Sequence, residues 1–272
     1  VLEINENAPM PQPSKGQVLV ENHAASINPA DWKLRAGYFK DYAPLQFPTT
    51  LGGDFAGVVV EVGGITDFKV GDEVYGSAII LNGGSGSFAQ ILASNTTNMA
   101  HKPKSADFVE AVALPLVGSS AVQALEEHIK LSSGQKILIH GGAGGIGHIA
   151  IQLAKALGAY VATTVATEDI DFAKSLGADL VIDYKSEQFE ETLKDFDAVF
   201  DTIGGETTDK SFKVLKKGGI LVSMLGQPNP DLAEKFNVEA FGQNTQTNTQ
   251  HLNRLAELVD SGKIKVHVDK IF

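Results

Sequence analysis

A glycine-rich turn between two apolar stretches restricts the fold of this chain more than any other feature. Ile137–His140 has the character of a strand, the glycines follow as Gly142-x-Gly144-x-x-Gly147, and apolar residues at helical spacing continue to Leu157. Gly142 permits a tight turn, Gly144 lets main chain approach a pyrophosphate, and Gly147 allows close helix–strand packing. The helix N-terminus adds free N–H groups that favour an anion. We therefore expect a dinucleotide to bind through Gly142, Gly144, Gly145, Ile146 and Gly147.

Strand-like and helical stretches alternate from this turn onward. We expect strands at 137–139, 160–165, 180–182, 198–200 and 220–224, with helices at 147–157, 169–176 and 207–215 between them. This alternation predicts an α/β fold with a doubly wound parallel sheet of the Rossmann type. A helix at 252–259 and a strand at 263–268 complete this part. Residues 1–110 instead show short strands broken by glycines, among them 87–92, which is typical of a β-rich domain.

Composition excludes several classes of function. The chain has 272 residues, a formal charge of −11 and no cysteine, and a pI near 5.1. Scattered acidic charge argues against nucleic acid and anionic membranes as partners. The absence of cysteine excludes disulfides, thiolate nucleophiles and cysteine-held zinc. Without a signal peptide or an apolar run of about 18 residues, a cytoplasmic location is the expectation. The chain begins without methionine and stops within an apparent strand, so we expect both ends to be truncated.

Seven segments together resemble one family in order and spacing. Besides the glycine turn they are residues 25–38, 51–59, 68–76, 113–121, 175–184 and 200–205. The chain resembles the medium-chain dehydrogenase/reductase superfamily, in its zinc-free, zeta-crystallin-like branch of quinone and enone oxidoreductases. The resemblance implies a GroES-like catalytic domain over 1–116, completed by a truncated 250–272, and a Rossmann NAD(P)-binding domain over 117–249.

The same resemblance locates the positions where zinc-dependent relatives hold their catalytic metal. Those relatives use a cysteine, a histidine and a second cysteine or an acid. Asn28, Gly53 (followed by Asp54) and Leu116 occupy these positions here. A catalytic zinc needs three protein ligands with N, S or O donors, and glycine and leucine side chains offer none. We expect no metal.

The choice of cofactor depends on the end of the second Rossmann strand. NAD-selective sites place an acid about 20 residues after the glycine turn, and counting from Gly142 reaches 162–164, where no acid stands. Thr163 and Thr164 leave room for a 2′-phosphate, to which Lys174 and Tyr184 can contribute. Glu168 and Asp169 argue against a 2′-phosphate, because their carboxylates would repel it where relatives often carry a phosphate-binding basic residue. Their alternative role is to complement the dipole of a helix capped by Thr167. The balance favours NADPH over NADH.

Several polar residues are candidates to contact the nicotinamide and the substrate. The resemblance implies that Ser120 and Asn28 lie near the nicotinamide, although Asn28 also suits a turn before Pro29. Lys33 and Tyr38 are candidates to stabilise or protonate the substrate oxygen, with a solvated helix face as the alternative for Lys33. We expect backbone groups at the ends of two strands to contact the nicotinamide and its ribose, namely those of Ile203, Gly204, Leu225 and Gly226.

These residues predict a zinc-independent oxidoreductase that transfers hydride from NADPH to a quinone or an α,β-unsaturated carbonyl. Two alternatives stay open: a non-catalytic NADPH-binding structural or regulatory protein, and an alcohol dehydrogenase-like activity. Relatives commonly form dimers by pairing their last Rossmann strands. We therefore expect a homodimer through the edge strand at 236–245.

Overall fold

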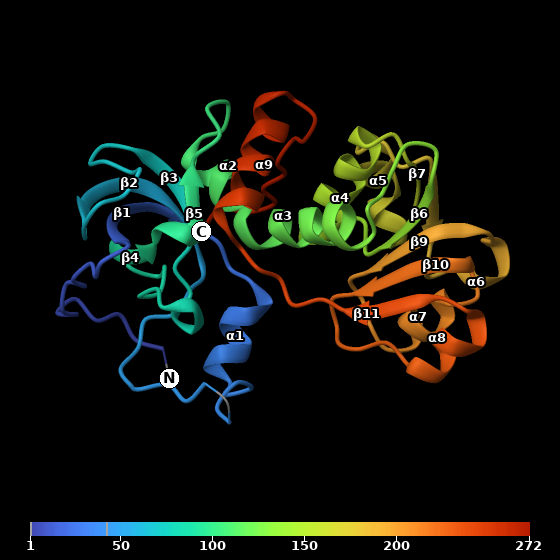
Figure 1. Cartoon of the computed structure of the whole chain (residues 1–272), viewed down its shortest axis with the longest axis horizontal. Helices are drawn as coiled ribbons and strands as arrows, with labels where there is room; N and C mark the ends of the chain where they lie inside the picture. Colours follow the sequence, from blue (N-terminus) through green and yellow to red (C-terminus); the bar gives the residue numbers. More distant parts are fainter. Residues whose placement is uncertain (1, 42) are drawn as a thin grey trace. The chain divides into compact units, whose positions relative to one another are not determined.

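The computed structural model describes residues 2–41 and 43–272, which divide into two compact units (Figure 1). The first comprises residues 1–116, 247–256 and 268–272, and the second comprises 117–246 and 257–267. Residues 257–267 thus pack with the second unit, whereas the sequence analysis placed 250–272 with the first domain. The domain boundaries of the sequence analysis stay a prediction.

The first unit is built on an antiparallel sheet in the order β4-β1-β2-β3-β5. Val18 and Val20 of β1, with Phe55 and Val59 of β2, are fully buried in its core. The close approach of β1 and β2 requires glycine at position 57, because a Cβ there would lie 2.0 Å from the Glu21 carbonyl oxygen. The strands are β1 (Gln17–Ala25), β2 (Asp54–Val62), β3 (Glu73–Ser77), β4 (Ile91–Asn95) and β5 (Met99–His101).

Short helices accompany this sheet. α1 (Pro29–Arg35) follows β1, α2 (Phe108–Val112) follows β5, and two 3-10 turns lie at Ile80–Asn82 and Thr96–Asn98. The part of α9 (Thr249–Asp260) up to Ala256 belongs to this unit. Tyr75 of β3 donates a buried 2.6 Å hydrogen bond to the carbonyl of Leu252 in α9, which ties this helix to the sheet.

The second unit contains a parallel sheet in the order β11-β10-β9-β6-β7-β8. Numbered from the first strand of the unit, this is the 3-2-1-4-5-6 order of dinucleotide-binding folds, whose ligands bind at the carboxyl ends of the strands where the order reverses. The expected doubly wound sheet is therefore confirmed. Its strands are β6 (Lys136–His140), β7 (Tyr160–Val165), β8 (Leu180–Asp183), β9 (Phe196–Asp201), β10 (Leu215–Ser223) and β11 (Glu239–Gly242).

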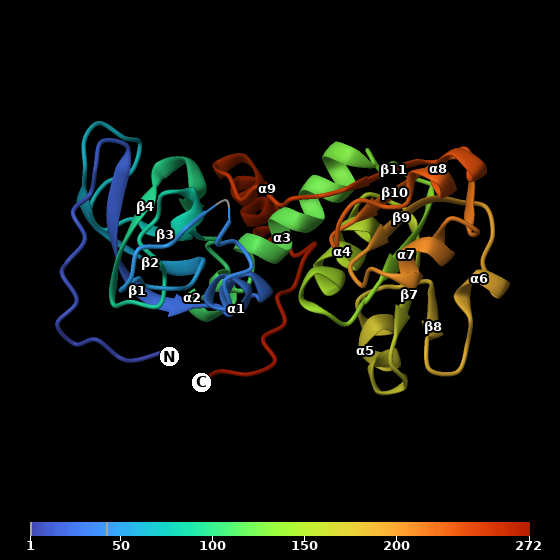
Figure 2. The same ribbon diagram turned by 90° about the horizontal axis from the view of Figure 1, so that it is seen from below.

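Helices cover this sheet on both faces. They are α3 (Pro115–Val122) with a π-helical turn at Gln123–His128, α4 (Gly145–Ala156), α5 (Ile170–Ser175) after a 3-10 turn at Thr167–Asp169, α6 (Phe189–Thr192), α7 (Glu206–Ser211) and α8 (Pro230–Phe236). Figure 2 shows β9, β10 and β11 side by side, with α5 beside β7 and β8.

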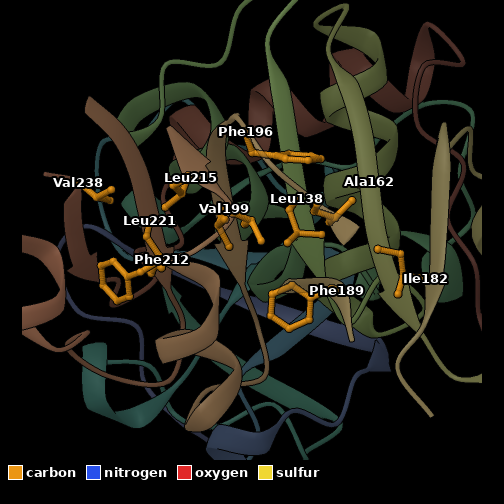
Figure 3. Close-up of a cluster of buried hydrophobic side chains, with 12 residues drawn as sticks. Leu138, Ala162, Ile182, Phe189, Phe196, Val199, Phe212, Leu215, Leu221 and Val238 are labelled. Carbon is orange, nitrogen blue, oxygen red and sulfur yellow. The ribbon is translucent and has the colours of Figure 1, made fainter. Parts of the chain in front are cut away.

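Apolar side chains form a continuous row across this sheet. Leu138, Val199 and Leu221 lie opposite one another on β6, β9 and β10, and all three are fully buried (Figure 3). Phe189 of α6 and Phe212 after α7 pack on the same cluster. Complete burial of a leucine-sized side chain contributes about 1.5–3 kcal/mol, so this row holds the strand ends in position.

Three expected strands differ from the structure. Residues 263–268 form no strand: the Gln152 side chain of α4 donates to the Lys265 carbonyl at 3.0 Å and accepts from its N–H at 2.9 Å, in place of a neighbouring strand. The strand expected at 87–92 begins only at Ile91, because the Asn22 side chain binds the carbonyls of Ser87 and Ala89.

The edge strand expected at 236–245 is also shorter than predicted. α8 continues to Phe236 and ends at Asn237, whose φ of 53° is left-handed, so β11 covers only Glu239–Gly242. β11 does lie at the edge of the sheet. Among the described residues, no helix combines the length and apolarity needed to cross a membrane.

Candidate cofactor and substrate sites

The glycine turn joins β6 to α4 in the second unit. Gly144 is the N-cap of α4, with φ −78° and ψ 173°, and no side chain caps the helix. A Cβ on Gly142 would lie 2.1 Å from the Thr163 hydroxyl oxygen, and a Cβ on Gly147 would lie 2.1 Å from the Gly141 carbonyl oxygen. A side chain at position 147 would therefore require the backbone to shift, and one at position 142 would require the buried Thr163 side chain to move.

This turn presents main-chain donors at the surface. Gly145, Ile146 and Gly147 are the first three residues of α4, whose N–H groups have no partner one turn earlier in an α-helix. Gly144 and Gly145 are exposed, while Gly142 and Gly147 are buried against the sheet. Unpartnered N–H groups at the positive end of a helix, with exposed glycines at 144 and 145, fit the pyrophosphate of a dinucleotide.

The threonines of β7 point their hydroxyls into the unit. Thr163 donates to the Ile139 carbonyl at 2.7 Å, and Thr164 lies 2.9 Å from Nδ1 of His140. Both threonines are buried, whereas Tyr184 and Lys174 lie at the surface. The structure thus separates the four residues that the sequence analysis grouped around a 2′-phosphate, and their role in cofactor binding stays a prediction.

The turn after β7 is held by Asp183 at the end of β8. Thr167 donates its hydroxyl to Asp183 at 2.6 Å, so it does not cap α5 as expected; Asp169 stands at that position. The Lys185 ammonium contacts both carboxylate oxygens of Glu168, at 2.9 and 2.7 Å. The sequence did not indicate Lys185 as a candidate, because it reaches Glu168 only through the pairing of β7 with β8.

The loops after β9 and β10 contact each other. A Cβ on Gly204 would lie 2.6 Å from Cβ of Leu225, and the Ile203 and Leu225 side chains are about half exposed. The structure therefore brings Ile203, Gly204, Leu225 and Gly226 together at the carboxyl ends of the strands. However, the N–H groups of Ile203 and Gly204 already donate to the buried Asp201 carboxylate, at 2.8 and 3.1 Å.

Ser120 and His140 are fully buried within the second unit. The Ser120 hydroxyl lies 2.7 Å from that of Thr245. The two ring nitrogens of His140 lie 2.9 Å from the hydroxyls of Thr164 and Ser211. Burial lowers the pKa of His140 to about 4, although Asp201 and Glu190 act in the opposite direction. His140 is therefore neutral near pH 7, and its ring is engaged by the protein itself.

A buried polar cluster lies in the first unit, around the start of α1. The Asn28 side-chain amide donates to Asp54 at 2.8 Å and to Ser26 at 3.2 Å. The same oxygen of Asp54 also accepts from the Ser26 hydroxyl at 3.0 Å and the Leu116 N–H at 3.3 Å. Asp31 accepts from the Asn28 main-chain N–H at 2.7 Å, which fixes the entry to α1.

Asp54 was not a candidate in the sequence analysis, yet it is the centre of this cluster. Its exposure is 3%. Burial raises the pKa of Asp54 to about 7, against the lowering effect of the donors from Asn28, Leu116 and Ser26. The signal in the sequence was an acid that opens an apolar strand, Asp54-Phe55-Ala56.

The cluster changes what Asn28 can do. The amide N–H groups of Asn28 are directed at Asp54 and Ser26, so its side chain can offer a ligand only its carbonyl oxygen, which also faces the Asp31 N–H in the capping box of α1. Lys33 and Tyr38 lie toward the other end of α1: the Lys33 ammonium is 5.9 Å from the ring of Trp32, and Tyr38 meets that ring edge-on at 5.5 Å. Tyr38 is 64% exposed.

The donor set offers little to a zinc ion. None of the three positions named above carries an acid, although Asp54 follows Gly53; Gly53 has no side chain, and the Leu116 side chain has no donor atom for a metal. Within 2–41 and 43–272, no group of three or more His, Cys, Asp or Glu residues is arranged to hold a metal. The residues present therefore do not fit a catalytic zinc.

Comparison with known proteins gives matches along nearly the whole chain. Residues 14–104 match a family model described as an alcohol dehydrogenase GroES-like domain, and 176–272 match one described as a zinc-binding dehydrogenase. The chain is 41% identical to a 2-methylene-furan-3-one reductase of Solanum lycopersicum and 40% identical to an NADPH-dependent alkenal/one oxidoreductase, chloroplastic, of Arabidopsis thaliana. Each match covers 99% of this chain and 68% of the relative.

A solved structure of similar fold extends this finding. The Escherichia coli quinone oxidoreductase complexed with NADPH is 29% identical, with a TM-score of 0.83 over 97% of this chain and 85% of that one.

Proposed function

The chain belongs to the quinone and enone oxidoreductases of the medium-chain dehydrogenase/reductase superfamily, and we propose that it reduces a quinone or an α,β-unsaturated carbonyl with NADPH. The observation that carries the proposal is the turn between β6 and α4. There, the glycines at 142 and 147 allow close packing, and the first N–H groups of α4 lie at the switch point of the sheet without partners one turn earlier in the helix.

The second unit would hold the cofactor. Main-chain N–H groups of 145–147 would bind the pyrophosphate, and the contacting loops after β9 and β10 would lie along the nicotinamide half. Ser120 is buried and bonded to Thr245, so it would support this site from within. When bound, the cofactor supplies a hydride from C4 of its nicotinamide, and the residues of the chain orient it.

The first unit would act on the substrate oxygen. Hydride addition to a quinone or enone leaves negative charge on that oxygen, which hydrogen-bond donors must meet in the absence of a metal. We propose the Lys33 ammonium and the Tyr38 phenol for this task, since both are held beside Trp32 on α1. Asn28, whose donors are engaged by Asp54 and Ser26, would act as an acceptor through the carbonyl lone pair that the capping box of α1 does not use.

Zinc independence, the homodimer and a cytoplasmic location are further proposals. Zinc independence is supported by the unsuitable donor set at Asn28, Gly53 and Leu116. A homodimer through β11 is supported by its place at the sheet edge, where its outer main-chain groups can pair with a second copy. Relatives include proteins named chloroplastic and mitochondrial, so the compartment is a matter for imaging the full-length protein.

The decisive experiment combines binding with turnover. NADPH and NADH are titrated into metal-stripped protein, and NADPH oxidation is then followed with 1,2-naphthoquinone and with a short 2-alkenal. We expect tighter binding of NADPH and turnover that added zinc does not raise. Tight binding without turnover would favour a structural or regulatory NADPH-binding protein, whereas oxidation of simple alcohols that depends on zinc would favour an alcohol dehydrogenase.

A further inference from the structure

An ion pair lies just beyond the carboxyl ends of two neighbouring strands of the second unit. Glu168 follows β7, which ends at Val165, and Lys185 follows β8, which ends at Asp183. Val165 and Asp183 are paired in the parallel register, so the two turns leave the sheet side by side. The Lys185 ammonium contacts both oxygens of Glu168, and the side chains are 46% and 66% exposed.

The main chain beneath this pair is held firmly. One oxygen of Asp183 accepts from the Thr167 hydroxyl at 2.6 Å, and the other accepts from the Lys185 N–H at 2.9 Å. Asp183 is itself only 7% exposed. The backbone positions of both turns are therefore fixed, while the Glu168 and Lys185 side chains are free to separate into solvent.

The place of the pair in the fold indicates what it would meet. In a sheet of this order, the end of the second strand lies beside the adenosine ribose of a dinucleotide, where an acid accepts from the 2′-hydroxyl of NAD or a base binds the 2′-phosphate of NADP. β7 is that second strand, and both kinds of group meet at its carboxyl end. The acid comes from the turn itself, and the base comes from the neighbouring strand.

We propose that Glu168 and Lys185 form a selector for the coenzyme, in which Lys185 leaves Glu168 to bind a 2′-phosphate and Glu168 accepts from a 2′-hydroxyl. This inference rests on the proposed dinucleotide binding at the glycine turn. An exposed ion pair is worth only about 0.2–1 kcal/mol, so a phosphate with nearly two negative charges competes well for the same ammonium.

The charges around the pair make Lys185 the decisive residue. Glu168, Asp169, Asp171 and Asp183 all lie in or next to the two turns, and Lys174 of α5 is the other base nearby in sequence. Without the Lys185 ammonium, the acids facing a 2′-phosphate would repel it. With Lys185 in place, removal of the Glu168 charge should strengthen phosphate binding.

The test compares three variants by equilibrium binding. Lys185→Ala and Glu168→Gln alter the pair, and Lys216→Ala is the matched control. Lys216 is 50% exposed and pairs with Asp197 at the amino ends of β9 and β10, the opposite edge of the sheet. Dissociation constants are measured for NADPH, NADH and 2′,5′-ADP, with melting temperatures to verify folding.

We expect Lys185→Ala to weaken the binding of NADPH and 2′,5′-ADP about tenfold and the binding of NADH less than twofold. The dissociation constant for NADPH should also depend less steeply on salt concentration in this variant. Glu168→Gln should tighten the binding of NADPH severalfold and weaken the binding of NADH. Lys216→Ala should leave the dissociation constants of all three ligands unchanged. Equal effects of Lys185→Ala on NADPH and NADH, or no effect on either, would overturn the selector while leaving the proposed function intact. A wild-type protein that binds neither coenzyme would overturn both.

Discussion

The buried carboxyl of Asp54 predicts that the first unit loses stability as pH rises. Its pKa is raised from 3.8 to about 7 by burial. The folded unit therefore holds a proton there that the unfolded chain releases above 3.8, so the stability that this proton contributes is complete at low pH and is lost as pH rises through about 7. The difference of about 3 pKa units corresponds to an upper limit of about 4 kcal/mol, at 1.36 kcal/mol per unit.

Asp54→Asn removes this titration while keeping the shape of the side chain. The amide retains one oxygen that can accept from Asn28, Ser26 and the Leu116 N–H, which all bind the same oxygen of Asp54. Between pH 5 and pH 8 the free energy of unfolding of the wild-type unit should fall by about 3 kcal/mol, and that of the variant should not show this fall.

Trp32 makes the assay specific for this unit. It is the only tryptophan of the chain and lies in α1, next to the cluster. Urea unfolding followed by its fluorescence at pH 5 and pH 8 gives the free energy of unfolding for each protein, with the exposed Asp67→Asn as the control. If wild type and Asp54→Asn lose the same stability between the two pH values, the argument from burial is wrong.

Three further predictions concern single residues. The pKa of His140 is lowered to about 4, so the free energy of unfolding of the second unit should fall by roughly 3 kcal/mol as pH falls from 6.5 to 4. Hydrogen exchange of the β6 amides should show this fall in the wild-type protein but not in His140→Asn. Gly147→Ala places a methyl group 2.1 Å from the Gly141 carbonyl and should cost about 1–3 kcal/mol, with NADPH binding at least tenfold weaker by titration. Tyr75→Phe leaves the buried Leu252 carbonyl without its 2.6 Å donor and should lower the free energy of unfolding by about 1–3 kcal/mol in the Trp32 assay.

Local features of the sequence predicted the strand, turn and helix that form the candidate cofactor site. The spacing of Gly142, Gly144 and Gly147 after a strand depends only on neighbouring residues, and the strand, turn and helix are where that spacing indicates. The alternation of apolar runs was likewise sufficient to predict the parallel sheet, because each run had to be buried whatever its partners.

Features that depend on distant partners were beyond the sequence. The extended segment at Lys265 is held by Gln152 of α4, 113 residues earlier, so its strand-like pattern was misleading. The raised pKa of Asp54 arises from burial among Ser26, Asn28 and Leu116, which belong to two segments far from Asp54 in the sequence. The hydroxyls of Thr163 and Thr164 point inward because their partners are Ile139 and His140 of β6. Counting residues from the glycine turn could not predict these contacts.

Asp201 has a consequence for ligand chemistry at the end of β9. By taking the N–H groups of Ile203 and Gly204, it removes two main-chain donors that this loop could otherwise offer to a ligand, whereas main-chain carbonyl oxygens can only accept. A loop of this kind discriminates in favour of ligands that carry amide hydrogens. With the nicotinamide bound along this loop, as we propose, a coenzyme analogue with an acetyl group in place of the carboxamide should bind less tightly than the natural compound.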